Sequence, residues 1–142
     1  MASLDLTPRI AALYDLQAAF MEPKLKKLGI GWSTFQLLSA VRGAGDEASQ
    51  ADVARRLGVT PATLSEAVTA HTKRGLLEQV PSGRDRRVKL LALTGRAKKI
   101  LNAVLEEASV VEEKMVADLS KKDLAGLLKL LDQCIDSVEP TA

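Results

Sequence analysis

The chain has 142 residues, of which 46% are hydrophobic and 27% are charged, a balance typical of one compact globular domain over residues 1–142. No apolar run approaches the roughly 18 residues that a membrane span needs, and residues 1–8 lack the pattern of a signal peptide. With one cysteine and one histidine, the sequence excludes an internal disulfide and the usual zinc site. We therefore expect a protein of a reducing cytoplasm, with no metal and no cofactor.

Charge is distributed unevenly along the chain, although the net charge is only +2. Residues 71–99 contain nine basic and two acidic residues, a net charge of +7, whereas the rest of the chain carries 11 basic and 16 acidic residues. Such segregation is typical of a face that binds a polyanion. A solvated basic surface without a partner would produce the same pattern.

Capping and turn residues divide the sequence into about six helices and one β-hairpin, so we expect a mainly α fold with a small antiparallel hairpin. Thr7 and Pro8 predict the start of the first helix, which Pro23 should kink or interrupt before residues 29–31 end it. A second helix is predicted from the capping box at residues 33–36 to the glycines at 43–45.

Two further helices form a predicted helix-turn-helix. Ser49 caps a short helix that ends at Gly58, and Thr60 with Pro61 starts the next one, which ends at residue 75. Val59 is expected to pack between the two helices. A turn this sharp lets the second helix protrude far enough to enter a major groove of DNA.

A basic hairpin follows the helix-turn-helix. Residues 76–80 and 87–93 predict two antiparallel strands, and residues 81–85 have the chemistry of a turn. Three arginines at the tip, Arg84, Arg86 and Arg87, are long enough to reach an adjacent minor groove. A helix-turn-helix followed by such a wing is a winged helix.

The C-terminal third predicts two long helices. Thr94 caps one that extends to about Asp118, and Ser120 caps another that ends near Val138. Their apolar stripes are broader than one small core needs. We therefore expect this surface either to be buried in a dimer interface or to form an exposed patch that binds a partner. Cys134, placed among leucines, is expected to be a small core residue and not a redox sensor.

Three segments carry a family resemblance: Ser49–Ser65 (SQADVARRLGVTPATLS), Lys73–Leu77 (KRGLL) and Arg84–Thr94 (RDRRVKLLALT). They resemble the MarR family of bacterial winged helix-turn-helix transcriptional regulators, and the resemblance extends over nearly the whole chain. It implies a winged core at residues 32–95, dimerisation helices at 7–28 and 96–138, and a homodimer on a palindromic duplex. It also implies release of DNA by a small phenolic or other anionic aromatic effector.

The resemblance and the predicted faces together give a candidate DNA interface. In the recognition helix the residues are Thr60, Ala62, Thr63, Ser65, Glu66, Thr69 and Lys73. In the wing they are Arg84, Arg86 and Arg87, and candidate phosphate contacts are Ser33, Thr34, Arg55, Arg56 and Arg74. We expect a cytoplasmic, nucleoid-associated repressor without catalytic residues, because no nucleophile–base set or phosphate loop is recognisable.

Several of these residues have alternative roles. Asp85 should hold one of the wing arginines, and the candidate phosphate contacts could be solvated or, for Ser33, explained by capping alone. Glu66 could accept a hydrogen bond from a cytosine amino group or repel phosphate. In the latter case, the chain would be a winged-helix protein-interaction module without DNA binding.

Two further features lie outside that interface. His71 is expected to be a partly buried structural residue. Tyr14, Trp32 and Phe35 could line an effector pocket, although core packing is the expected role of Phe35.

Overall fold

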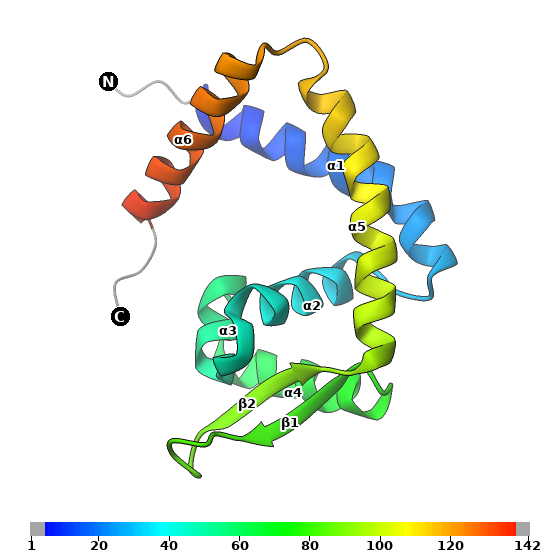
Figure 1. Ribbon diagram of the computed structural model, residues 1–142, viewed down its shortest axis with the longest axis vertical. Coiled ribbons are helices and arrows are strands. Elements are labelled where there is room, and N and C mark those ends of the chain that lie inside the picture. The colour runs from blue at the N-terminus through cyan, green and yellow to red at the C-terminus, as the bar shows by residue number, and fades with distance from the viewer. Residues whose placement is uncertain (1–4, 139–142) are drawn as a thin grey trace. The chain divides into compact units, whose positions relative to one another are not determined.

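The structure is a computed structural model that describes residues 5–138. Its elements are α1 (Leu6–Lys27), α2 (Trp32–Ala44), the 3-10 turn η1 (Gly45–Glu47), α3 (Gln50–Leu57), α4 (Pro61–Lys73), β1 (Leu77–Pro81), β2 (Lys89–Leu93), α5 (Gly95–Val116) and α6 (Lys121–Val138). The predicted fold class, mainly α with one antiparallel hairpin, is confirmed (Figure 1). The chain forms two compact units, one up to Glu107 and one from Ala108, and each is described by itself.

The starts of α1 and α2 differ from the prediction. α1 begins at Leu6 after Asp5, so Thr7 is not its cap, and the helix continues through Pro23 without a break. α2 begins at Trp32 after Gly31, and no side chain caps it. The capping box predicted from Ser33 is therefore wrong. These residues lie inside the first turns of the helix, where their side chains make tertiary contacts instead.

The helix-turn-helix has the predicted caps. The Ser49 hydroxyl accepts a hydrogen bond from the backbone N–H of Asp52, and the Thr60 hydroxyl accepts one from Thr63, each at 3.1 Å. Gly58 ends α3 with a φ of 65°, a left-handed conformation that suits glycine. Val59 remains 36% exposed, so the prediction that it packs between the helices is wrong.

One hydrophobic core joins α2, α3, α4, the hairpin and the start of α5. Leu38 and Val53 are completely buried, and Leu64, Leu76 and Leu101 are each 1% exposed. Burying a side chain of this size contributes roughly 1.5–3 kcal/mol to stability. The recognition helix and the wing are therefore mounted on a common, well-packed platform.

The hairpin is anchored at its base and free at its tip. Leu77 pairs with Leu93 at the base and Pro81 with Lys89 at the far end. The N–H of Leu91 also donates to the carbonyl of Ala48 at 2.7 Å, which ties β2 to the segment before α3. Beyond these contacts the turn of the hairpin projects away from the core (Figure 1).

The caps predicted for the last two helices are confirmed. Thr94 accepts a hydrogen bond from the N–H of Ala97 at 3.1 Å, and Ser120 accepts one from Asp123 at 3.0 Å. No described residue of α6 is buried. Cys134 is exposed as well, so the prediction of a core cysteine is wrong for this chain by itself. No helix within residues 5–138 combines the length and apolarity of a membrane span.

Candidate nucleic-acid interface

The recognition helix α4 presents a continuous exposed stripe. Leu64 and Val68 fix its inner face, since they are only 1% and 2% exposed. The seven residues predicted for the outer side are all exposed: Thr60, Ala62, Thr63, Ser65, Glu66, Thr69 and Lys73. Because residues at i, i+4, i+7 and i+11 share one helix face, positions 62, 66, 69 and 73 form its centre line. The side chains at its N-terminal end are short, which allows close approach to base edges.

The tip of the wing is shaped by two side chains. Ser82 is buried, and its hydroxyl accepts hydrogen bonds from the backbone N–H groups of Arg84 (3.2 Å) and Asp85 (3.4 Å). One Asp85 carboxylate oxygen accepts from the backbone N–H of Arg87 at 3.0 Å and from its Nε at 3.3 Å. The arginine held by Asp85 is therefore Arg87.

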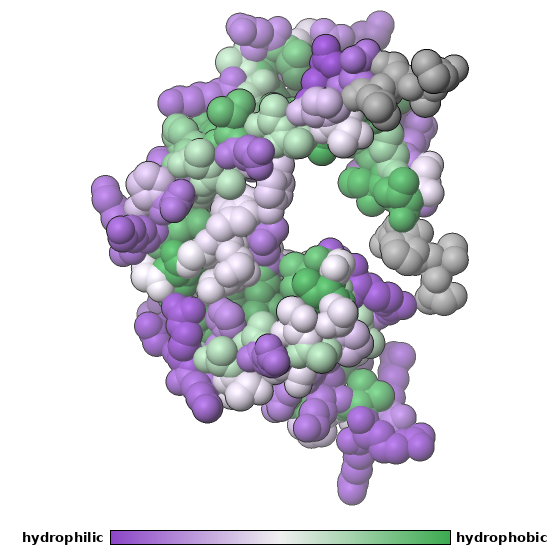
Figure 2. Space-filling model, turned by 180° about the vertical axis from the view of Figure 1, so that it is seen from behind, coloured by the Kyte–Doolittle hydropathy of each residue, from purple (hydrophilic) through white to green (hydrophobic). Residues whose placement is uncertain are grey.

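Arg84 and Arg86 are the wing arginines left available. Both are exposed, and within residues 5–138 neither guanidinium has a hydrogen-bonding or ion-pair partner. The projecting end of the hairpin is strongly hydrophilic in the space-filling view (Figure 2). The tip thus offers two cationic side chains that no carboxylate of the described residues neutralises.

The candidate phosphate contacts are not equivalent. Ser33, Arg55 and Arg56 are exposed, although Arg55 forms an ion pair with Asp52. Thr34 is only 5% exposed and hydrogen-bonds to His71, so it is not accessible to a phosphate. Arg74 donates from Nη2 to the carbonyl of Gly29 at 2.9 Å, which directs its guanidinium toward the start of α2.

The three aromatic residues singled out in the sequence lie together. Trp32 donates from Nε1 to the Tyr14 hydroxyl at 2.7 Å, and the two rings meet edge-to-face with centroids 5.7 Å apart. Phe35 packs beside Trp32 at 5.3 Å and against the core. Trp32 also lines a hollow of about 580 Å³ whose wall includes two carboxylates, Asp15 and Glu22.

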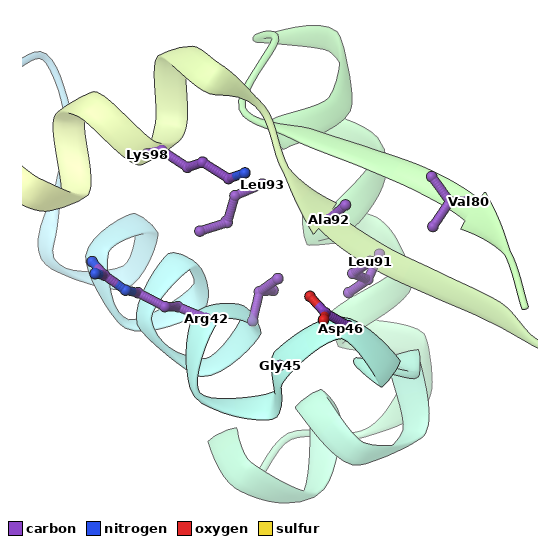
Figure 3. A pocket seen from close by; sticks show the side chains of 9 residues that line it. Arg42, Gly45, Asp46, Val80, Leu91, Ala92, Leu93 and Lys98 are labelled. Carbon is purple, nitrogen blue, oxygen red and sulfur yellow. The ribbon is translucent and has the colours of Figure 1, made fainter.

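A second pocket, of about 240 Å³, lies between the end of α2, η1, the hairpin and the start of α5 (Figure 3). Val41, Val80, Leu91 and Leu93 supply apolar lining. Lys98 extends over the Leu93 side of the pocket, and the Asp46 carboxylate points into it from η1. Arg42 points away and donates from Nη1 to Asn102 at 3.1 Å.

Sequence reasoning missed this second pocket. Its walls come from four separate segments between residues 41 and 98, so no local motif marks it.

Comparison with known proteins agrees with this geometry. Residues 28–88 match the model of the MarR family. The fold matches a mutant MarR from E. coli in complex with operator DNA (TM-score 0.74, 19% identity, 93% of this chain and 94% of that chain covered). It also matches the organohalide-sensing regulator RdhR in a form with bound 2,4-dichlorophenol (TM-score 0.74, 21% identity, 99% and 84% covered). A third match is a mutant MepR from S. aureus bound to an oligodeoxyribonucleotide (TM-score 0.63, 20% identity, 96% and 99% covered).

At these identities the solved structures establish a shared fold. The family model covers α2, the helix-turn-helix and the wing as far as Val88, the elements that form the exposed stripe and the basic tip. Over this segment, residues 28–88, the chain is similar to the MarR family.

Proposed function

We propose that the chain is a sequence-specific, double-stranded DNA-binding transcriptional regulator that acts as a homodimer on the bacterial nucleoid, most simply as a repressor. The main observation behind this proposal is that the exposed stripe on α4 and the wing-tip residues Arg84 and Arg86 belong to the same compact unit. The E. coli MarR and S. aureus MepR structures that share this fold contain DNA, which supports the same use of the surface.

In the proposed complex, α4 enters the major groove and the wing tip follows the backbone toward the adjacent minor groove. Ala62 and Thr63 are short enough to contact base edges, and Glu66 can accept a hydrogen bond from the N4 amino group of cytosine. Arg84 and Arg86 are attracted by the negative potential of the minor groove. A two-fold dimer places its recognition helices about one helical turn apart, roughly 34 Å.

Selection of bound sequences from random duplexes tests this proposal. We expect enrichment of a palindrome with half-site centres about 10 base pairs apart. With Glu66→Gln, the preference for cytosine at one position of each half-site should relax by roughly 1–3 kcal/mol, because an amide can also donate. Ser65→Ala serves as a nearby control on the same helix.

Failure to enrich any sequence, even at low salt, would contradict the proposal. It would favour the winged-helix protein-interaction module, for which the exposed carboxylate of Glu66 is the supporting feature.

We further propose that a small anionic effector binds in the pocket of Figure 3. The pocket combines an apolar lining with Lys98, whose ammonium group has no hydrogen-bonding or ion-pair partner within residues 5–138. Its volume of about 240 Å³ suits a carboxylate with a single-ring or short aliphatic body. The larger hollow beside Trp32 has two carboxylates and one lysine, which disfavours an anion, whereas the pocket of Figure 3 has one carboxylate, Asp46, and two cationic residues, Lys98 and Arg42. The fold match to RdhR with bound 2,4-dichlorophenol supports a small-molecule response.

Benzoate and its uncharged analogue benzamide are suitable probes for this pocket. We expect calorimetry to detect benzoate but not benzamide, and Lys98→Gln to weaken benzoate binding by about tenfold or more, since a charged hydrogen bond contributes roughly 1.5–3 kcal/mol. Lys99→Gln is the charge-matched control. Trp32 is the only tryptophan of the chain, so its fluorescence reports the other hollow. Benzoate binding that quenches Trp32 and is indifferent to Lys98→Gln would refute the assignment.

A further inference from the structure

A chain of hydrogen bonds connects the recognition helix to the start of α2. His71 of α4 lies with Nδ1 2.6 Å from the carbonyl oxygen of Ala67 and with Nε2 2.9 Å from the hydroxyl of Thr34. Arg74, at the C-terminal end of α4, donates from Nη1 to the same hydroxyl at 3.4 Å and from Nη2 to the carbonyl of Gly29 at 2.9 Å. α4 and the start of α2 therefore meet at the buried hydroxyl of Thr34, and Arg74 also connects α4 to the loop at Gly29.

The proton positions in this network follow from the chemistry of its members. A carbonyl oxygen can only accept, so Nδ1 of His71 must carry a hydrogen that it donates to Ala67. In the neutral ring Nε2 is then an acceptor, and it receives the hydroxyl hydrogen of Thr34. The oxygen of Thr34 remains free to accept from Arg74. Every donor has an acceptor only when His71 is neutral and has its hydrogen on Nδ1.

Protonation of His71 disrupts this arrangement. Nε2 would then carry a hydrogen of its own, and the buried Thr34 hydroxyl would lose the atom that accepts its hydrogen bond. A buried hydroxyl without an acceptor is costly, and the imidazolium would share one oxygen with the guanidinium of Arg74.

No nearby carboxylate offsets that charge in the described contacts. The only charged residue of α2 is Arg42, at the opposite end of that helix. In α4, Glu66 and Lys73 lie on the exposed stripe, and the adjoining end of α1 contributes Lys24, Lys26 and Lys27 together with Glu22, which faces the hollow beside Trp32.

We infer that Thr34, His71 and Arg74 position the recognition helix, and that the form with neutral His71 is the one able to bind DNA. The inference rests on the proposed function, because it assigns the network a role in DNA binding. It also predicts the direction in which DNA affinity changes as the pH is lowered. A histidine that merely added positive charge near DNA would raise affinity at low pH, whereas loss of this network lowers it.

The network itself can be tested without DNA. His71 is the only histidine of the chain, so nitrogen-15 NMR of the imidazole gives one unambiguous pair of ring signals. At pH 8 we expect the Nδ1–H tautomer in the wild type and in Thr34→Ser, which keeps the hydroxyl. An Nε2–H tautomer in the wild type would overturn the inference.

The role in positioning is tested by duplex affinity at pH 8.0 and pH 5.5, at equal ionic strength. We expect the wild type to lose at least about fivefold in affinity at pH 5.5, from the loss of a buried hydrogen bond. His71→Gln, whose amide oxygen can accept from Thr34 but does not titrate, should bind like the wild type at pH 8.0 and keep its affinity at pH 5.5. Thr34→Ser should retain the wild-type profile.

Thr34→Val completes the set. It removes the shared hydroxyl, so it should bind more weakly at pH 8.0 and lose the fall in affinity toward pH 5.5. If wild-type affinity is unchanged or rises at pH 5.5 relative to His71→Gln, the positioning role is refuted. If no duplex binds at any pH while the Nδ1–H tautomer is present, the proposed function fails and the positioning role fails with it, whereas the network stands.

Discussion

Replacing Arg84 and Arg86 together by alanine should lower affinity for the selected duplex by about 100-fold or more, while the protein stays folded. Each arginine that contacts DNA contributes roughly 1–3 kcal/mol, and a homodimer loses four of them. Neither side chain has an intramolecular partner within residues 5–138, so their removal leaves no buried group unpaired. The turn that carries them is held by Ser82 and Asp85, which remain in place.

Fluorescence anisotropy at several salt concentrations measures this effect. The slope of log affinity against log salt should become shallower by about one for each phosphate contact that is lost. Arg42→Ala removes one positive charge per subunit, half as many as the double variant, at a site away from α4 and the wing tip, and it should leave both quantities unchanged. Lysine at positions 84 and 86 should preserve the salt slope but lose part of the affinity, because lysine lacks the planar fork of arginine.

Two results would contradict the assignment of the wing. One is an unchanged affinity for R84A/R86A. The other is an equal loss for Arg42→Ala, which would mean that net charge and not the wing controls binding. Arg87→Ala gives a further comparison, because Asp85 already holds Arg87 although its side chain is 92% exposed. We expect Arg87→Ala to lower duplex affinity by less than alanine substitution of either Arg84 or Arg86.

The helix-turn-helix could be predicted because its signals are local. A hydroxyl three residues before a backbone N–H, as in Ser49 and Thr60, caps a helix almost regardless of what surrounds it. Gly58 adopts a conformation that few other residues tolerate. Such interactions span three or four positions, and the sequence contains all of their participants.

Features that depend on distant residues could not be predicted in the same way. Ser33 and Thr34 are residue types that often cap helices, but the residue before α2 is Gly31. Thr34 is buried because His71 of α4 packs against it. Val59 is an apolar residue of the kind usually found in a core, but it lies on the surface of the turn. The pocket beside Lys98 exists only because four segments converge. In each case the outcome depends on which element packs alongside.

Cys134 shows the same limit in the second unit. Its leucine neighbours suggested a core, but every described side chain of α6 is at least partly exposed in the single chain. An apolar helix face that its own chain does not cover requires a partner in water. A second copy of the same chain is the occupant that we propose for this face, as the homodimer requires.

Introducing two charges on that face, Leu131→Glu with Ile135→Glu, should convert the dimer to a monomer and abolish specific DNA binding. Leu128, Leu131 and Ile135 follow the i, i+3, i+7 spacing of one helix face and are 55%, 38% and 54% exposed. Burying two carboxylates in an apolar interface costs several kcal/mol per ion, which exceeds the margin of most dimers. A monomer occupies one half-site only, so the linkage that gives operator affinity is lost.

Sedimentation equilibrium measures the oligomeric state of these variants, and fluorescence anisotropy on the same samples measures their DNA affinity. Gln133→Glu with Ser137→Glu adds the same two charges on the opposite face of α6, and this control should remain dimeric and bind DNA like the wild type. Circular dichroism should show that both variants keep their helices, because the core of the first unit does not include α6. A dimeric, DNA-binding L131E/I135E protein would place the dimer contact elsewhere. A monomeric L131E/I135E protein with full operator affinity would show that one subunit is sufficient for DNA binding, against the two-fold arrangement proposed here.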